Sequence, residues 1–429
     1  MVEYLKLENV GPAPSMELEL GSRLNLLTGD NGLGKSFLLD VIWWTLTGVW
    51  PAEVNPSIAG GRPAAPLDPK VSAVVRLGKR WAEKSSESVF QFRRQGLFWM
   101  GETPHGTFAP GLVAYILADG SHAVWDPARN DSPRLESTGI PAAFVLNPLE
   151  LWNGLTQDRS SLCNGLIDDW AGWQKENSET FRILASALDV LSPTGETPLG
   201  PGRLTRISLR DARDIPTVTM PYGEDVPLPL AASGIRKAAA FAYLLTWMWT
   251  EHLRACELQG QAPAKELTFL VDELDAHLHP RWQRTILRSL LAAAGQLSPD
   301  LKVQLVCATH SPLVMASAEP LFDPETDAWF DLDLVPNGAG TPRVALTRRP
   351  LLPTGNASDW LVSEAFDLDD PGSEEREVAL RRAEAAMDDG HMDLGAAREL
   401  HKELLRLLPE TDSFWMRWRH FGRRQGWWK

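Results

Sequence analysis

The chain has 429 residues, of which 44% are hydrophobic and 23% charged, and its formal net charge is −14. This composition is that of a globular protein with a large core, and the negative charge excludes a surface that is basic throughout, so any contact with DNA has to be local. Cys163, Cys256 and Cys307 lie far apart without a CxxC pair, which argues against a disulfide framework and a structural zinc site and favours a reducing cytoplasm.

Nothing in the sequence predicts a membrane location. The first ten residues, MVEYLKLENV, resemble a strand and lack the basic and then apolar regions of a signal peptide. The longest apolar run, Ala238 to Trp249, is too short to span a bilayer and is flanked by charged residues. We therefore expect a buried helix there, and a cytoplasmic protein that makes no contact with a membrane.

The first predicted elements are strands. Val2 to Leu7 and Met16 to Leu20 alternate apolar and polar residues across a turn of glycine and proline, which predicts two antiparallel strands. The apolar run Leu24 to Leu27 predicts a buried strand, and Phe37 to Trp44 predicts a helix. The loop GDNGLGKS lies between these two elements, so strand, loop and helix follow in the order of a P-loop.

The loop contains the residue types that phosphate binding requires. Gly29, Gly32 and Gly34 permit backbone angles that a Cβ would forbid, so that successive N–H groups turn toward phosphate oxygens at a helix N-terminus. Lys35 is expected to reach the β- and γ-phosphates and Ser36 to hold Mg2+. The predicted ATP-binding residues are Gly29, Asp30, Asn31, Gly32, Leu33, Gly34, Lys35, Ser36 and Phe37.

The middle of the chain changes from strand to helix periodicity. After a loop rich in proline and glycine at 51–69, the segments KVSAVVRL, SVFQFRR, LVAYILAD and AAFVL predict a β-rich sublobe. Residues 149–191 have helical periodicity and predict an inserted helical lobe. Since no long heptad run occurs between Ser36 and Ser233, a long coiled-coil arm is excluded. Residues 193–229 link this lobe to the segment AASGIRK.

Two later strands end in polar side chains. Leu267 to Val271 runs directly into Asp272 and Glu273, and the strand Val303 to Cys307 runs into ATHSP, which contains His310. A helix is predicted between them at 280–294. Strands that alternate with helices predict a mostly parallel sheet, whose ligand binds at the carboxyl ends of the strands.

The remaining chain is predicted to hold two edge strands, FDLDLVP and TPRVALTR, two helices at 374–387 and 394–408, and a basic, aromatic tail. We divide the chain into four parts: 1–148, the first half of an ATPase core with the P-loop and β sublobe; 149–229, the helical lobe and linker; 230–352, the second half of the core; and 353–429, a helical tail.

The four motifs GDNGLGKS, AASGIRK, LTFLVDELDAHLHP and VCATHSP together resemble the ATP-binding-cassette (ABC) type of P-loop ATPase, most closely its soluble RecF- and SMC-like branch, often named simply AAA-family and related to the overcoming-lysogenization-defect (OLD) proteins. The resemblance covers about residues 1–50 and 225–350. It implies an α/β P-loop NTPase fold of the ABC/SMC-head type, with a mixed sheet, flanking helices, an antiparallel β sublobe, an inserted helical lobe and a short helical tail.

The resemblance also assigns roles. Asp272, with Ser36, matches the carboxylate that orders Mg2+, and Glu273 matches the residue that polarises the attacking water. His310 matches the histidine that senses the γ-phosphate, and together with Lys35 these groups imply Mg2+-dependent ATP hydrolysis. The residues Glu273, His310 and Lys35 are therefore the catalytic candidates.

In this branch the signature loop of one subunit contacts the ATP bound to another, so the resemblance implies an ATP sandwich in a homodimer or higher oligomer. Ser233, Gly234 and Arg236 are the candidate signature residues. The sequence departs from the pattern at Ala232, which stands where a phosphate-contacting serine is usual. Loss of that hydroxyl weakens transition-state binding by about 1.5–3 kcal/mol and predicts slow hydrolysis unless Ser233 substitutes.

Two further motifs have alternative interpretations. The HxH of His277 and His279 could be a metal pair, but nothing nearby in the sequence completes a ligand set and the soluble branch itself has such histidines. Asp331 and Asp333 form a DxD that could indicate a metal-dependent nuclease, although their spacing suits an edge strand. A separate nuclease or toxin partner is the preferred hypothesis.

The tail FWMRWRHFGRRQGWWK leaves two interpretations open. Its arginines, interleaved with Trp415, Trp418, Trp427 and Trp428, suit a nucleic-acid backbone with base stacking, or an acidic partner. The alternative is a terminal helix that packs its aromatic residues against a core and leaves its arginines in solvent.

Our first functional hypothesis is an ATP-dependent switch that dimerises on ATP and controls a separate effector in an antiphage system, similar to the Septu-type ATPase. The second is a RecF- or SMC-like DNA-repair ATPase or DNA clamp. The third is a transporter cassette, which the histidine-rich loop after Glu273 disfavours because transport cassettes usually carry a proline and an SALD-like loop there.

Overall fold

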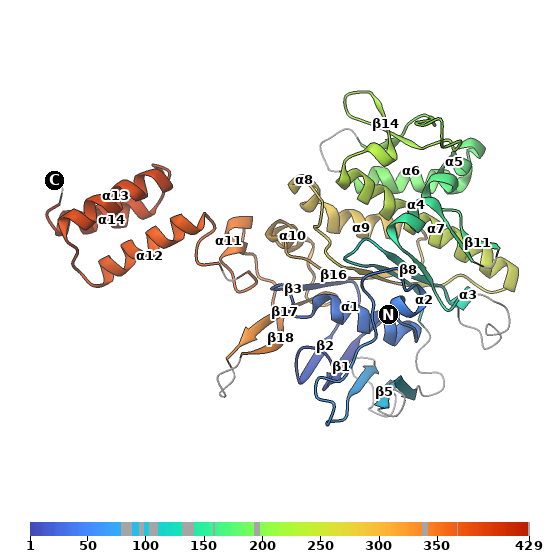
Figure 1. Cartoon of the computed structure of the whole chain (residues 1–429), viewed down its shortest axis with the longest axis horizontal. Helices are drawn as coiled ribbons and strands as arrows, with labels where there is room; N and C mark the ends of the chain where they lie inside the picture. Colours follow the sequence, from blue (N-terminus) through green and yellow to red (C-terminus); the bar gives the residue numbers. More distant parts are fainter. Residues whose placement is uncertain are drawn as a thin grey trace. The chain divides into compact units, whose positions relative to one another are not determined.

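A computed structural model describes residues 1–78, 88–93, 98–102, 110–130, 141–157, 159–192, 198–336, 342–366 and 368–427. The chain forms two compact units, Met1–Pro353 and Thr354–Lys429 (Figure 1). Among the helices within those described ranges, none has both the length and the apolar character needed to cross a bilayer.

The strands of the first unit are β1 Tyr4–Glu8, β2 Ser15–Glu19, β3 Leu24–Gly29, β4 Val74–Gly78, β5 Ser88–Arg93, β6 Phe98–Glu102, β7 Leu112–Ile116, β8 His122–Trp125, β9 Phe144–Leu146, β10 Leu155–Gln157, β11 Ser160–Cys163, β12 Gly200–Pro201, β13 Thr217–Thr219, β14 Asp225–Pro227, β15 Glu266–Val271, β16 Lys302–Ala308, β17 Ala328–Val335 and β18 Arg343–Arg349. Its helices are α1 Lys35–Thr47, α2 Pro51–Val54, α3 Pro127–Asn130, α4 Pro148–Asn153, α5 Leu166–Glu176, α6 Glu179–Leu191, α7 Ser233–Gln259, α8 Pro280–Gln283, α9 Ile286–Gly295 and α10 Pro312–Ala318, with short 3-10 turns at Leu228–Leu230 and Glu319–Leu321.

The core is an eight-stranded sheet in the order β18-β17-β3-β16-β15-β7-β8-β9. Its five central strands, from β17 to β7, are parallel, and antiparallel strands extend both edges. The P-loop strand β3 is buried from Leu24 to Thr28, because β16 and β17 cover its two edges. The predicted mixed sheet is confirmed. Strand β17, however, is not an edge strand as predicted, since it pairs with β3 as well as with β18.

Helices cover both faces of the sheet. Helix α1 is apolar on almost all sides and packs between the central sheet and a five-stranded antiparallel sheet, β2-β1-β4-β5-β6, within one continuous core (Figure 1). A helix that is apolar all round has to be buried on all sides. The antiparallel sublobe exists as predicted, but two strands assigned to it, β7 and β9, belong to the central sheet, where β7 pairs in parallel with β15.

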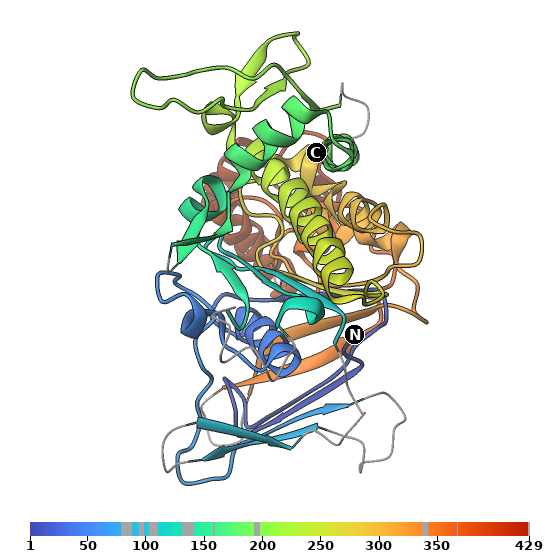
Figure 2. The same cartoon turned by 90° about the vertical axis from the view of Figure 1, so that its right-hand side faces the viewer.

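The helical lobe consists mainly of α5 and α6, which pack with the 27-residue helix α7. Two elements of this region were not predicted: the β10-β11 hairpin and the β12-β13-β14 sheet, which occupies part of the predicted linker. Residues 193–197 of that linker lie outside the described ranges. Figures 1 and 2 show the β12–β14 sheet and the β1–β2 hairpin at opposite ends of the first unit. The single helix predicted at 280–294 is divided into α8 and α9 at Arg284 and Thr285.

The second unit contains α11 Ala357–Leu361, α12 Glu374–Asp388, α13 Leu394–Leu407 and α14 Phe414–Arg424. Alanines of α12 and leucines of α13 form its core with aromatic residues of α14, among them Trp415 and Trp418, which are 4% and 0% exposed. This burial contradicts base stacking by those two tryptophans and agrees with the alternative of a packed terminal helix. Arg419, Arg423 and Arg424 are exposed, while Trp428 lies outside the described residues.

The topology confirms the predicted fold class, an α/β P-loop fold with a mixed sheet, flanking helices, an antiparallel sublobe and a helical lobe. The four-part division of the chain stays a prediction. The first compact unit contains its first three parts, and the second unit begins at Thr354.

Candidate functional site

The P-loop has the backbone that its glycines predict. Gly29, Gly32 and Gly34 have φ angles of 124°, 81° and 108°, in the left-handed region that disfavours other residues. A Cβ at Gly29 would lie 2.1 Å from the carbonyl oxygen of Leu332, and one at Gly34 would lie 2.7 Å from the ring of Pro12. The loop is therefore closely packed from behind at two of its three glycines, and α1 begins directly after it.

Lys35 is 5% exposed, and its Nζ donates hydrogen bonds of 2.6 and 2.8 Å to the carbonyl oxygens of Gly29 and Asp30. Burial lowers the pKa of this ammonium group, and the charges of nearby carboxylates, chiefly Asp272, oppose the shift. The lysine thus links its own end of the P-loop to the start of the loop, and it lies close enough to Asp272 for their charges to interact.

Asp272 follows the last residue of β15 and is 4% exposed. Its backbone N–H donates to the carbonyl oxygen of Ile116 at the end of β7, which fixes it at the carboxyl edge of the sheet. Burial raises the pKa of the carboxyl group, while a hydrogen bond from Ser36 acts in the opposite direction. The P-loop serine and the carboxylate at the end of β15 therefore meet.

These two residues fit a divalent cation. Within the described part of the chain, Oδ2 of Asp272 is buried and has no hydrogen-bond partner, a state that is unfavourable for a carboxylate oxygen unless a ligand satisfies it. A carboxylate and a hydroxyl side by side are oxygen ligands that suit Mg2+, which keeps several waters and binds proteins through few side chains.

Glu273 lies at the start of the loop after β15 with an exposed side chain and a φ of 43°. Its N–H donates to Oδ1 of Asp272 at 3.0 Å. A positive φ at a residue other than glycine is unfavourable and is often found at functional sites, where the surrounding structure holds it. The backbone thereby holds the second carboxylate beside the first one but outside the core.

The loop after β16 is attached to the same region. Oδ1 of Asp275 accepts hydrogen bonds from the hydroxyl of Thr309 and the N–H of His310, at 2.5 and 3.0 Å. Burial lowers the pKa of His310, and the charge of Lys35 lowers it further. His310 is therefore near enough to the P-loop lysine to interact with its charge, across about 275 residues of sequence.

The candidate signature residues lie at the start of α7. Ala232 is the N-cap and its side chain caps nothing, while Ser233 and Arg236 are exposed and Gly234 is half-buried. The first N–H groups of a helix have no partner within the helix, so a long helix that begins in this way attracts an anion. The structure places this helix end next to the loop that follows Glu273, since the Oγ of Ser233 lies 3.5 Å from the carbonyl oxygen of His277.

Sequence reasoning missed three residues of this region: Asp275, Lys237 and Asp40. Asp275 is the third acidic residue of DELD and could have been found from its spacing. Lys237 donates to three carbonyl oxygens of the loop after β15, and nothing in its sequence context indicates that. Asp40 accepts a hydrogen bond of 2.9 Å from the hydroxyl of Tyr115, and burial raises its pKa to about 7.

The two alternative metal motifs find no support. His277 and His279 are exposed, and across the described ranges no group of three or more histidine, cysteine, aspartate or glutamate residues is arranged to bind a metal ion. Asp331 is 1% exposed, accepts a 2.7 Å hydrogen bond from the hydroxyl of Thr28, and lies 3.6 Å from a guanidinium nitrogen of Arg349. It is thus a buried, paired residue of β17 rather than half of an open metal site.

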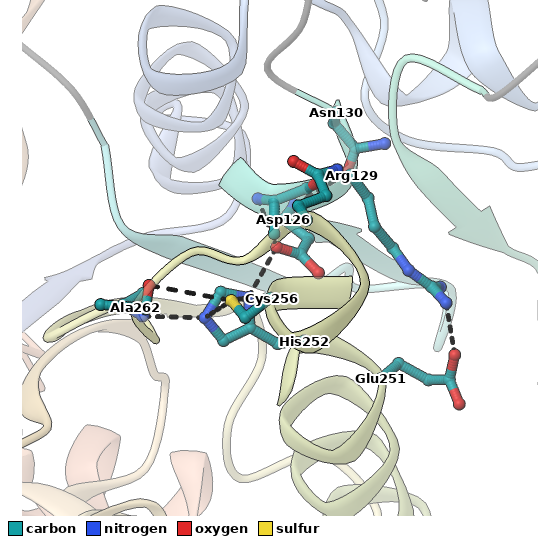
Figure 3. Close-up of polar contacts among 10 residues, drawn as sticks. Asp126, Arg129, Asn130, Glu251, His252, Cys256 and Ala262 are labelled. Carbon is teal, nitrogen blue, oxygen red and sulfur yellow. Dashed lines mark hydrogen bonds and ion pairs between the residues drawn. The ribbon is translucent and has the colours of Figure 1, made fainter. Parts of the chain in front are cut away.

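A cysteine, a histidine and an aspartate also meet near the end of α7 (Figure 3). Nδ1 of His252 lies 2.7 Å from Asp126, and Cys256 Sγ lies 3.5 Å from Nε2. That nitrogen already accepts a 2.8 Å hydrogen bond from the N–H of Ala264, so it is not available as a base. Burial raises the pKa of Cys256, which disfavours the thiolate, so this cluster is a structural link between α3, α7 and the following loop.

The site therefore has its phosphate loop, its paired carboxylates and its histidine loop on neighbouring strands, at the carboxyl edge of one mixed sheet. With the P-loop between β3 and α1, this topology defines a P-loop nucleoside triphosphatase. The comparisons with known proteins narrow that class.

Residues 128–316 match the family described as "AAA domain, putative AbiEii toxin, Type IV TA system", and residues 4–85 match a second family described as "AAA domain". The two matches contain Lys35, Ser36, Asp272, Glu273, His310 and the start of α7. These two segments are thus similar to AAA-family domains, in agreement with a P-loop ATPase.

A curated relative, "Retron Vc95 probable ATPase" of Vibrio cholerae serotype O1 biovar El Tor, is 31% identical over 137 residues. This match covers 31% of the chain and 23% of the relative, so the chain spans less than a quarter of the relative's length. Among solved structures, an SMC head domain from Thermotoga maritima is 14% identical to this chain, with a TM-score of 0.38. The match covers 81% of this chain and 98% of the SMC head domain. A second structure is an Smc head domain with an extended coiled coil, bound to the C-terminal domain of ScpA derived from Pyrococcus furiosus. It is 13% identical to this chain with a TM-score of 0.37, and the match covers 81% of this chain and 96% of the Smc chain.

Proposed function

We propose that this chain is a cytoplasmic ATP-hydrolysing switch that dimerises around ATP and controls a separate effector protein in antiphage defence. The observation that carries the proposal is the meeting of Lys35, Asp272 and the Thr309–His310 loop at one edge of the sheet. Phosphoryl transfer needs little more than positioned charges around a triphosphate, and these groups supply them.

Each residue has a chemical task in this proposal. The N–H groups of the P-loop and the ammonium group of Lys35 bind the β- and γ-phosphates, for which Lys35 exchanges its carbonyl partners in the loop. Ser36 and Asp272 would hold Mg2+, which when bound neutralises charge on the β- and γ-phosphates. Glu273 accepts a proton from the attacking water, and His310, whose lowered pKa keeps it neutral near pH 7, contacts the γ-phosphate.

The proposed dimer depends on the start of α7. Ser233 and Arg236 are exposed beside uncapped N–H groups, which suits the γ-phosphate of ATP bound to a second copy. Two copies would then enclose two ATP molecules in a symmetric, head-to-tail manner. Ala232 supplies no hydroxyl there, so we expect slow turnover, which suits a switch better than a motor.

The defence role is supported by the retron ATPase to which the chain is similar and by the toxin-related description of its family. The chain has a helical lobe and a separate second unit beyond its ATPase core, and these are the parts that would contact an effector. Pull-down of the product of the adjacent reading frame, with and without ATP, tests this part of the proposal.

The central experiment measures molar mass by light scattering with the Glu273→Gln variant, which should bind ATP without hydrolysing it. We expect a dimer with ATP and Mg2+, a monomer with ADP, and hydrolysis at least ~100-fold slower than wild type, the effect typical of a lost general base. The exposed residue Glu257 provides the matched control, Glu257→Gln, which should hydrolyse ATP normally. A Glu273→Gln protein with wild-type turnover would refute the assignment.

A DNA clamp is a second candidate, because Arg419, Arg423 and Arg424 form an exposed basic strip on α14. It predicts ATP-dependent retention on DNA without a protein partner, and a retention that weakens as salt rises. Two results together exclude the clamp. The wild-type protein is not retained on DNA, and the variant in which glutamine replaces all three arginines still controls the effector.

A further inference from the structure

The helix that presents the candidate signature residues also reaches the loop that contains Glu273. One turn into α7, Nζ of Lys237 donates hydrogen bonds of 2.9, 3.2 and 3.0 Å to the carbonyl oxygens of Glu273, Leu274 and Ala276. An ammonium group has three N–H donors and no acceptor, so the three carbonyls use all of them. A single side chain of α7 thus organises the turn that follows β15.

That turn has an unfavourable backbone. Glu273 and His277 have φ angles of 43° and 62°, which residues other than glycine adopt only when the surroundings hold them. Three carbonyl dipoles that converge on one point repel one another, and a positive charge between them removes the repulsion. Burial lowers the pKa of Lys237 to about 8, although Asp275, Glu273 and Asp272 favour the charged form, so the lysine is held in place at a cost in solvation.

The start of α7 also contacts the same turn directly. The hydroxyl of Ser233 lies 3.5 Å from the carbonyl oxygen of His277, and a Cβ at Gly234 would lie 3.4 Å from that oxygen. A cavity of about 410 Å³, lined among others by Lys237, Glu273 and Trp152, lies beside the contact. The helix end is therefore joined to the turn, and both of them line this cavity.

We infer that Lys237 is a positioning residue that couples the start of α7, where the phosphate of the partner's ATP would bind, to the backbone of Glu273 in its own site. The inference rests on the proposed ATP-bound dimer. When the partner's phosphate pulls the first turn of α7, Lys237 moves the three carbonyls and with them the carboxylate of Glu273. Neither site in a dimer then reaches full activity until the partner site is occupied.

The test compares Lys237→Met, which keeps the length of the side chain but has no donor, with Lys237→Arg, which keeps the charge. We expect Lys237→Met to bind ATP within about 2-fold of wild type, to lower kcat about 100-fold, as misplacement of a reacting group by 1 Å does, and to reduce the Hill coefficient for ATP to 1. Lys237→Arg should recover part of the lost kcat. The exposed residue Lys302 provides the control Lys302→Met, which should behave as wild type.

Hydrogen exchange separates this inference from the proposed function. In the protein without nucleotide, the amides of Ala276 and Leu278, which donate to Glu273 and Asp275 within the turn, should exchange faster in Lys237→Met than in Lys302→Met. Unchanged exchange, or an unchanged kcat with an unchanged Hill coefficient, overturns the inference. A wild-type protein that neither dimerises with ATP nor hydrolyses it overturns both the proposed function and the coupling. Faster exchange in Lys237→Met would in that case still establish that Lys237 holds the turn through its hydrogen bonds. Equal losses of ATP binding and kcat would reduce Lys237 to a structural role and also overturn the coupling.

Discussion

The carboxylate of Asp275 accepts a 2.5 Å hydrogen bond from the hydroxyl of Thr309, which joins the loop after β15 to the loop after β16. The same oxygen accepts the N–H of His310 at 3.0 Å. Asp275→Ala should therefore release the histidine loop and lower kcat by about 10- to 100-fold with little effect on ATP affinity, because the P-loop makes none of these contacts. Steady-state ATPase kinetics with a separate binding titration measure both quantities.

The control for that prediction is Asp275→Asn, which keeps an oxygen acceptor at the same place. It should retain at least a third of the wild-type kcat, whereas Asp275→Ala leaves the donors of Thr309 and His310 without their acceptor, a cost of about 1–3 kcal/mol. Equal kcat values for the two variants would show that Asp275 does not position the loop.

Lys35→Ala should abolish measurable ATP binding. The change removes charge-assisted hydrogen bonds to two phosphates, each worth about 1.5–3 kcal/mol, and so raises the Kd for ATP by about 100-fold or more. Isothermal titration with ATP and Mg2+ measures this. Lys70→Ala removes an exposed lysine of the same unit and should bind ATP normally, and circular dichroism should show the wild-type spectrum for both variants.

Gly29→Ala should lower the thermal stability much more than Gly48→Ala. Both glycines have a positive φ, so both variants incur the backbone strain of about 1–3 kcal/mol. A methyl group at Gly29 also collides with the carbonyl oxygen of Leu332, whereas nothing lies within 4 Å of one at Gly48. Scanning fluorimetry should show a Tm lower by at least ~5 °C for Gly29→Ala than for Gly48→Ala. Similar Tm values would mean that β3 can move away from β17.

The buried carboxyl group of Asp40 should make the stability of the folded protein depend on pH. Burial raises the pKa of its carboxyl group from 3.8 to about 7, so the folded protein holds a proton that the unfolded chain releases. Its contribution to stability is complete below about pH 4, falls as the pH rises to about 7, and is lost above that. Asp40→Asn keeps an acceptor for Tyr115 and removes the titration.

The free energy of unfolding of Asp40→Asn, relative to wild type, should therefore rise between pH 5 and pH 8.5. Urea unfolding at both values measures the difference, and the exposed residue Asp68, which lies outside the core, gives the control Asp68→Asn. A difference that does not change with pH would place the pKa of Asp40 near its ordinary value.

Local sequence signals predicted the parts of the site that local geometry determines. The apolar run before GDNGLGKS and the one before Asp272 each define a buried strand and the polar group at its end, because a strand that is buried on both faces has a continuous apolar sequence. Strand β7 has the same character, yet the sequence does not show that it pairs with β15 rather than with β5. The partner of a strand is decided by long-range packing, and the apolar pattern fits both sheets.

The supporting residues escaped prediction for a related reason. Lys237 occupies an ordinary helical position, and only the fold brings three carbonyl oxygens from a turn 36 to 39 residues further along to its ammonium group. The raised pKa of Asp40 likewise depends on burial beside Tyr115, 75 residues away. The motifs thus name the groups that meet the nucleotide, while the residues that hold those groups become visible only in three dimensions.

The position of β3 between β16 and β17 has a consequence for biosynthesis. Both strands that pair with β3 come after residue 300 in the sequence. A nascent chain that ends before them therefore contains the phosphate loop and β3 but neither of the strands that pair with β3. Such an intermediate presents unpaired apolar edges, which favour association with chaperones or with other chains. Ribosome-bound fragments that end before β17 should accordingly fail to retain ATP, because the phosphate loop is supported only after β17 has been synthesised.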